Sequence, residues 1–255
     1  MYFEKKCYYI SMKKICLEIQ YNGKNFCGWQ TQPNGRSVQE VLEKRIEELI
    51  GERIKLFASG RTDSGVHAIC QIAHFETNTD FIVEKLAKAV NFGLTDDVRV
   101  LKSYEVAHDF HARFNAKKKT YLYKIYDSEI RKPLKEGFAE RVYKVDINLM
   151  KQAARYFLGR HNFKAFCAAN TSVLDFSREI YKVDIKNIDD EIHIEICGNG
   201  FLYNMVRIMV GALVKVGEEK IEPQAIQDML DSGVRCPLVK TMPPYGLYLK
   251  IVEYN

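Results

Sequence analysis

The chain has 255 residues, of which 47% are apolar and 28% charged, with a net charge of +5 and a pI near 8.7. This composition is typical of a soluble protein with a hydrophobic core, in one large domain or two small ones. Seven scattered cysteines without C-x-x-C spacing argue against a disulfide framework and favour reduced thiols in a cytoplasmic protein. The most apolar segment, FLYNMVRIMVGALV, carries an arginine and is too short for a membrane span.

Regular patterning begins near Met12, so we expect residues 1–11 to be a short N-terminal extension. Alternating apolar residues predict a strand over 14–21. Apolar residues at helical spacing predict a helix over 38–50, with Ser37 at its N-cap. The next expected elements are strands near 54–58 and 69–77, a helix near 82–92 and a strand near 98–106. The order is β-α-β-β-α-β.

The second half of the chain predicts a similar order. Strands are expected over 120–126, 178–188, 191–197 and 246–254, and helices over 146–159, 201–217 and 223–231. Two β-α-β-β-α-β units predict an α+β fold with two ferredoxin-like halves, whose mainly antiparallel sheets are joined side by side. We expect an N-terminal domain over 12–107 and a C-terminal domain over 108–255.

The loop ASGRTDSGVHA, residues 58–68, carries the first candidate for chemistry. Asp63 in such a loop most often caps the local backbone in an Asx-turn. Gly60 and Gly65 allow a ligand to approach closely, and loops between two strands often present reactive groups. No second carboxylate lies nearby in the sequence, so Asp63 would act alone, as a nucleophile or a base.

Arg207 is the single charged residue between Glu195 and Lys215, within an apolar helix. A buried guanidinium is costly unless it is paired, although a long stem can also carry it to solvent or to a structural carboxylate. Asp63 is the candidate partner, and such a pair would keep its carboxylate ionised.

The segment FHARFNAKKKTYLYKIY, residues 110–126, interleaves basic and aromatic side chains. It is either a solvated charge run before a core strand, or phosphate-binding cations beside rings on which an RNA base stacks. Arg61 is either a surface residue or a group that enters a nucleic-acid stack or holds a phosphate. The spacing of histidines and cysteines does not favour a metal site.

Several motifs of the chain resemble those of the tRNA pseudouridine synthase A family. GRTDSGVHA resembles its catalytic motif, and the similarity extends through YNGKNFCGWQ, SVQEVLE, QIAHFET, DFHARFNA, YLYKIY, FLGRHNF, SREI, FLYNMVRIMVG and GLYL. The resemblance implies a pseudouridine synthase fold and an isomerase that needs no cofactor and no metal. The substrate would be uridine at positions 38, 39 and 40 in the anticodon stem-loop of tRNA.

The resemblance also implies roles for individual residues. Asp63 would be the catalytic nucleophile, and Arg207 its ion-pair partner. Arg61 would help to flip the target base out of the stem, and Tyr121 would bind or stack on the uridine. Contacts to tRNA would come from Phe110, His111, Arg113, Ser177 and Arg178. Members of the family act as homodimers.

Two other functions remain open from the residues alone. A non-catalytic protein that binds or folds RNA would explain the basic and aromatic segment but not Asp63 and Arg207. A hydrolase with an aspartyl nucleophile lacks the second acid or the metal ligands that usually accompany one. A synthase acting on other uridines is a further alternative.

Overall fold

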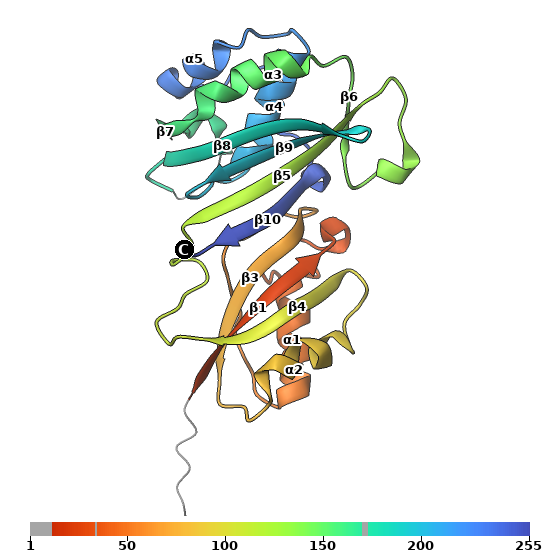
Figure 1. The fold of residues 1–255 in the computed structure, drawn as a ribbon, viewed down its shortest axis with the longest axis vertical. Helices are drawn as coiled ribbons and strands as arrows, with labels where there is room; N and C mark the ends of the chain where they lie inside the picture. The colour runs from red at the N-terminus through yellow and green to blue at the C-terminus, as the bar shows by residue number, and fades with distance from the viewer. Residues whose placement is uncertain (1–11, 34, 170–172) are drawn as a thin grey trace, which may run out of the picture.

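The computed structural model describes residues 12–33, 35–169 and 173–255. The predicted N-terminal extension, residues 1–11, lies outside the described residues. Within them, the chain forms one continuous sheet in the order β4-β1-β3-β10-β5-β9-β8-β7, with β2 paired to β3 and β6 to β5. Figure 1 shows this sheet running the length of the molecule.

The first half has the predicted β-α-β-β-α-β order. Its elements are β1 (Lys13–Tyr21), α1 (Val38–Ile50), β2 (Phe57–Ala58), β3 (His67–Thr77), α2 (Val83–Asn91) and β4 (Val98–Val106). Strand β1 lies between β3 and β4 and is antiparallel to both. The ferredoxin-like arrangement predicted for this half is therefore confirmed.

The second half repeats the arrangement with two additional short strands. Its elements are β5 (Lys118–Asp127), β6 (Glu140–Val142), α3 (Ile147–Ala154), β7 (Gly159–Asn162), β8 (Ser177–Ile188), β9 (Glu191–Gly198), α4 (Met205–Gly217), α5 (Ala225–Ser232) and β10 (Leu247–Glu253). The order β10-β5-β9-β8 places the last strand beside the first, as β4 lies beside β1 in the other half. Short 3-10 helices cover residues 23–25, 133–135, 155–157, 164–166 and 244–246.

The two halves meet where β10 pairs with β3 in parallel, through Tyr248 with His67 and Leu249 with Ala68. β1 occupies the other edge of β3, so β2 must share the edge used by β10, and it pairs there farther along, at His74. One edge of β3 therefore pairs with two strands in succession: β10, which is parallel to it, and β2, which is antiparallel. The loop between β2 and β3 lies at the place where they diverge.

The helices of both halves pack on the same side of the sheet (Figure 1). One core cluster includes Leu17 of β1, Tyr123 of β5, Ile194 of β9, Leu42 of α1 and Ile208 of α4. This continuity makes the two sheets one rigid platform, because strands of either half contribute to the same apolar layer.

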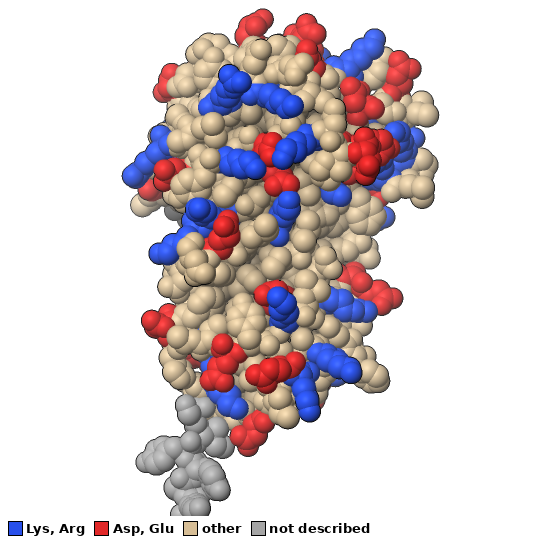
Figure 2. All heavy atoms as spheres, viewed as in Figure 1, with Lys and Arg blue, Asp and Glu red and all other residues tan. Residues whose placement is uncertain are grey.

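The opposite face of the sheet carries charges of both signs. Figure 2 shows acidic and basic side chains interspersed over it, with a stretch free of them near its middle. Lys250 pairs with Glu195 on this side, and Lys124 lies 3.6 Å from Glu191. The cations here are therefore largely neutralised by neighbouring carboxylates.

Local signals in the sequence set several element ends. Ser37 Oγ accepts a hydrogen bond of 3.2 Å from the amide of Glu40, and Gly51 ends α1 with φ of 70°, as predicted. The predicted helix over 146–159 was too long, because α3 ends at Ala154 and Gly159 instead begins β7. No helix within the described residues is long and apolar enough to cross a membrane.

Candidate active site

The loop that carries Asp63 is fixed at both ends by hydrogen bonds. Ser59 donates its amide to Ile72 of β3 at 2.7 Å and its hydroxyl to the side chain of Gln71 at 2.6 Å. The hydroxyl of Thr62 lies 2.7 Å from that of Tyr21. Each of these bonds is buried, so the loop is held in a single conformation although it is not part of a strand.

A second loop packs directly beneath the first. Trp29 donates its amide to the carbonyl of Thr62 at 3.1 Å, and Gly65 donates to that of Phe26 at 3.3 Å. Gly28 has φ of 109°, and a Cβ added there would lie 2.7 Å from the oxygen of Thr62. The segment YNGKNFCGWQ is therefore a support for the catalytic loop, and glycine is required where the two backbones touch.

Asp63 lies opposite the N-terminal end of α4. Its Oδ2 atom is 3.6 Å from Nη1 of Arg207, and the Arg207 side chain is only 14% exposed. The ion pair predicted from the sequence is therefore present, across about half the length of the chain. At this distance the charges attract each other, and the contact is longer than a strong charge-assisted hydrogen bond.

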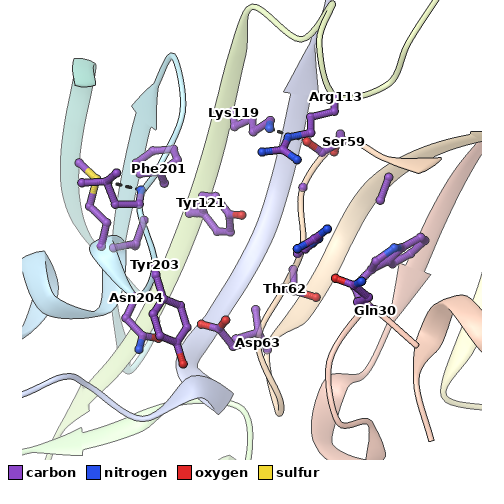
Figure 3. Close-up of a pocket in the computed structure, with 18 of the residues that line it drawn as sticks. Gln30, Ser59, Thr62, Asp63, Arg113, Lys119, Tyr121, Phe201, Tyr203 and Asn204 are labelled. Carbon is purple, nitrogen blue, oxygen red and sulfur yellow. Dashed lines mark hydrogen bonds between the residues drawn. The ribbon is translucent and has the colours of Figure 1, made fainter. Parts of the chain in front are cut away.

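Arg207 is held in place by groups other than Asp63. Its Nε donates to the carbonyl of Met242 at 2.6 Å, and Nη1 donates to Oδ1 of Asn204 at 2.6 Å. Asn204 precedes α4 with φ of 59°, and its side chain does not cap the helix. Figure 3 shows Tyr203 and Asn204 on one side of Asp63 and Thr62 on the other. The unusual backbone of Asn204 thus serves the orientation of Arg207.

Burial raises the pKa of Asp63 above its ordinary value, and the positive charge of Arg207 opposes this shift without cancelling it. Arg207 does favour the ionised carboxylate, as expected, but the sequence did not predict the opposing effect of burial. Desolvation is the larger effect, because the carboxylate lies inside a cleft. A carboxylate that is both poorly solvated and free of strong hydrogen bonds is a better nucleophile or base than one in water.

Tyr121 of β5 forms the wall next to Asp63. Its side chain is buried, and the ring packs edge-on against Phe201 with centroids 5.1 Å apart. Burial raises the pKa of the Tyr121 hydroxyl, and the charge of Asp63 adds to the effect, so the hydroxyl stays protonated. Figure 3 shows its ring between Phe201 and the loop of Asp63.

These residues line a pocket of about 770 Å³ that draws on both halves of the chain. Its charged lining consists of Lys55, Arg61, Arg113, Lys119, Arg178 and Asp63. Among the described residues, none of these five cations forms an ion pair with a carboxylate, although they lie together around one cleft. Cations left without carboxylate partners around a cleft are typical of a site for a polyanion.

Of the other residues predicted to contact RNA, some line the pocket and some lie outside it. Arg61 is exposed at the pocket, and His111, Arg113 and Arg178 line it as well. Phe110 is different, because it packs on the second, smaller core cluster with Cys16 and Tyr254. Ser177 begins β8 and binds Asp175 through its amide, outside the pocket lining.

The sequence did not single out several pocket residues. Tyr203 and Asn204 lie within FLYNMVR, and their nearness to Asp63 depends on where α4 begins. Lys55 and Phe57 precede the loop, and nothing in their spacing marks them. Lys55, two residues before Phe57, is the single local signal. Among the described residues, no cluster of histidine, cysteine and carboxylate side chains could hold a metal ion.

Comparison with known proteins gives the same family. A family model described as tRNA pseudouridine synthase matches residues 18–115 and 153–255. The tRNA pseudouridine synthase A of Thermoanaerobacter sp. is 43% identical over 95% of this chain and all of its own length. That of Bacillus pumilus is 42% identical over 95% of this chain and 99% of its own. The chain therefore belongs to the tRNA pseudouridine synthases, which are isomerases that act on uridine.

Proposed function

We propose that this chain converts uridine to pseudouridine at positions 38, 39 and 40 in the anticodon stem-loop of tRNA, with Asp63 as the catalytic nucleophile. The observation that carries the proposal is a single carboxylate in a pocket that is otherwise lined by five cations without carboxylate partners. The cations attract the phosphates of RNA, and the carboxylate is the one charged group suited to attack a base or a sugar.

The reaction requires the N-glycosidic bond to break, the uracil to turn, and a new bond to form between C5 and the ribose C1′. The proton on C5 leaves in the process. The carboxylate of Asp63 attacks C1′ or C6, or removes a ribose proton, and each of these routes needs it ionised and close to the sugar. Arg207 stabilises the charge of Asp63 without binding its oxygens.

A uridine within a stem is reached only after it is flipped out, at a cost of a few kcal/mol. Arg61 is exposed at the mouth of the pocket, where it can take the place of the flipped base in the stem. Tyr121 then packs on the uracil and retains it while the glycosidic bond is broken. The buried ring of Tyr121 and its apolar neighbour Phe201 suit a planar ligand.

The same proposal assigns the remaining partners. Contacts to the tRNA come from His111, Arg113 and Arg178 at the pocket, and from Phe110 and Ser177 outside its lining. The enzyme acts in the cytoplasm as a homodimer that binds one tRNA across both subunits. It needs no cofactor or metal, since isomerisation involves no net oxidation and no added group.

Release of tritium from tRNA labelled at C5 of uridine tests the reaction, because C5 loses its hydrogen when it bonds to C1′. We expect wild-type protein to release tritium, and we expect the rate of release by Asp63→Ala to be lower by a factor of about a thousand or more. Absence of release by wild-type protein contradicts the reaction. Activity retained by Asp63→Ala contradicts the role of the carboxylate.

Mapping of the modified positions tests the site. Modification at 38, 39 and 40 agrees with the proposal, and modification at other uridines favours a synthase of different specificity. Binding of tRNA without any tritium release favours a non-catalytic RNA-binding function. Tritium release and mapping of the modified positions together distinguish these three functions.

A further inference from the structure

The pocket has a second end that the isomerisation chemistry does not use. Phe57, His111 and Phe114 line it together with Lys55 and Arg113, and Asp63 is not among their contacts. Phe57 is 41% exposed and Phe114 is 75% exposed. Both rings contact His111, so they form one exposed aromatic patch at the pocket, and such a patch is typical of a binding site.

The rings at this end form one aromatic cluster. His111 lies 4.3 Å from Phe114 and 5.8 Å from Phe57, centroid to centroid, with the ring planes tilted by 35° and 57°. His74 packs on Phe57 at 5.3 Å, with the two planes 24° apart. Burial lowers the pKa of His74 to about 4, so this ring is uncharged at neutral pH. The rings therefore share no single plane, and Phe114, which is 75% exposed, presents the most open ring of the cluster to a planar base.

Cations lie over the same rings. Nζ of Lys55 is 5.6 Å from the centre of the Phe57 ring, and the guanidinium carbon of Arg113 is 5.8 Å from that of Phe114. Neither cation pairs with a carboxylate in the described part of the chain. A ligand that stacks on these rings and satisfies these cations is planar and carries negative charge, which describes a nucleotide.

Lys119 connects this end to the catalytic end. Its Nζ donates to the carbonyl of Ser59 at 2.6 Å, and the space beside Gly60 is bordered by both Lys119 Nζ and the hydroxyl of Tyr121. Burial and the nearby charge of Arg113 lower the pKa of Lys119 to about 8. Figure 3 shows Lys119 and Arg113 together on one side of Tyr121. Two cations without carboxylate partners at this midpoint suit a phosphate.

We propose that the pocket binds two nucleotides of one RNA strand: the target uridine at Asp63 and Tyr121, and a second base stacked on Phe57, His111 and Phe114, with the phosphate between them bound by Lys119 and Arg113. The inference rests on the proposed function, because it takes the first nucleotide to be the target uridine. It adds a base-binding subsite and the chemical class of its ligand, an unpaired nucleotide of the same strand.

Removal of the rings tests the subsite. We expect Phe114→Ala and Phe57→Leu each to raise KM for tRNA about tenfold while kcat changes little, because stacking contributes to binding and not to the chemical step. Phe57→Leu keeps apolar contact with His74 and loses only the ring. Phe92→Ala is the matched control, since Phe92 is 91% exposed and lies outside the pocket lining. Unchanged KM in both pocket variants contradicts the subsite.

A scan of abasic nucleotides around the target gives a second, independent readout. One abasic position is expected to weaken binding to wild-type protein about tenfold and to have no further effect on Phe114→Ala, because both changes remove the same stacking contact. Additive effects of the ring variant and every abasic position contradict the proposal. The scan does not depend on the stability of any variant other than Phe114→Ala.

The phosphate contact has its own test. Lys119→Gln is expected to raise KM, and Lys119→Arg to retain affinity. KM of wild-type protein should rise as the pH passes about 8, where the Lys119 ammonium loses its proton, and Lys119→Arg should remove this dependence. The groups facing Lys119 are the guanidinium of Arg113, the carbonyl of Ser59 and the hydroxyl of Tyr121, and burial raises the pKa of that hydroxyl above its ordinary value. A pH dependence that Lys119→Arg retains contradicts the assignment.

The two proposals fail in different ways. Absence of tritium release from wild-type protein overturns the proposed function. Normal tritium release combined with wild-type KM in the ring variants overturns the subsite alone.

Discussion

At the scale of the residue, the notable feature is the long ion pair of Asp63. The Nη1 atom of Arg207 lies 3.6 Å from the carboxylate, while the guanidinium makes shorter hydrogen bonds from Nη1 to Asn204 and from Nε to the carbonyl of Met242. A direct bidentate pair would hold both carboxylate oxygens and weaken Asp63 as a nucleophile. The arrangement keeps the electrostatic benefit of the arginine and leaves the oxygens available to substrate.

The pH dependence of kcat follows from this arrangement. Burial raises the pKa of Asp63 and Arg207 lowers it, and the carboxylate must be ionised to react. The rate of wild-type protein should therefore fall as the pH drops through this raised pKa. Arg207→Gln removes the opposing charge, so the pKa rises further and the acid limb moves to higher pH.

The measurement is a profile of single-turnover rate against pH for both proteins. Arg207→Lys serves as a control, because it keeps the positive charge while losing the planar donors. We expect its acid limb to lie nearer to that of wild-type protein. An acid limb of Arg207→Gln at or below the wild-type pH would contradict an electrostatic role for the arginine.

At the scale of the element, two loops form one unit. The segment over 22–30 packs under the loop of Asp63 through the amides of Trp29 and Gly65, and Gly28 lies close to the backbone of Thr62. The loop needs this support because β2 has only two residues and pairs with β3 through only two residue pairs. Precision at Asp63 therefore depends on residues that never touch the substrate.

Gly28→Ala tests this support. Its Cβ would lie 2.7 Å from the oxygen of Thr62, so the catalytic loop must shift, and we expect kcat to fall about a hundredfold. Gly51→Ala is the matched control, because Gly51 also has a positive φ but nothing lies within 4 Å of the added Cβ. It should cost about 1 kcal/mol of unfolding free energy and leave kcat unchanged.

Thermal unfolding and tritium release on the same samples separate the two effects. Equal losses of stability with a loss of kcat only in Gly28→Ala agree with the packing argument. A kcat of Gly28→Ala equal to that of wild-type protein would show that the two loops are not coupled.

At the scale of the whole molecule, the sheet of each half ends at the same junction. β10 comes from the C-terminus and pairs with β3 of the first half, so the pocket borders on both halves without a flexible linker between them. Among the described residues, the five cations of the pocket form no ion pair with a carboxylate, while Lys124 and Lys250 on the open face do. Under the proposed function, this local cluster of cations, more than the net charge of +5, would direct RNA to the pocket.

The salt dependence of tRNA binding tests whether the pocket cations contact phosphates. Arg113→Gln should reduce the slope of log K against log salt by about 0.7 to 0.9, as expected for the loss of one phosphate contact. Lys220→Gln is the control, because Lys220 pairs with Glu218 at 2.8 Å beyond the end of α4 distant from the pocket. Equal reductions in the two variants would mean that the pocket has no special role in phosphate binding.

Much of the fold could be predicted because local patterns of apolar and polar residues determine where its strands and helices form. Alternation predicted β1, and helical spacing with a capping serine predicted α1. The ends of other elements were less predictable. β2 is shorter than expected because the amide and the carbonyl of Leu56 bond to side chains of α1, Glu43 and Gln39, instead of to β3. α4 begins at Met205 because Asn204 adopts a left-handed backbone. The first of these causes is a contact between residues distant in the sequence.

The sequence by itself determined the candidate nucleophile, the buried arginine and the two β-α-β-β-α-β units, because composition and spacing act over a few residues. Only the tertiary structure decided that Arg207 reaches Asp63 without binding it, that Lys119 borders Gly60, and that Phe57 and Phe114 share the pocket. These relations depend on how β10 joins β3 and on the place where β2 diverges. They join residues far apart in the chain, where packing and hydrogen bonding, and not local preference, fix the geometry.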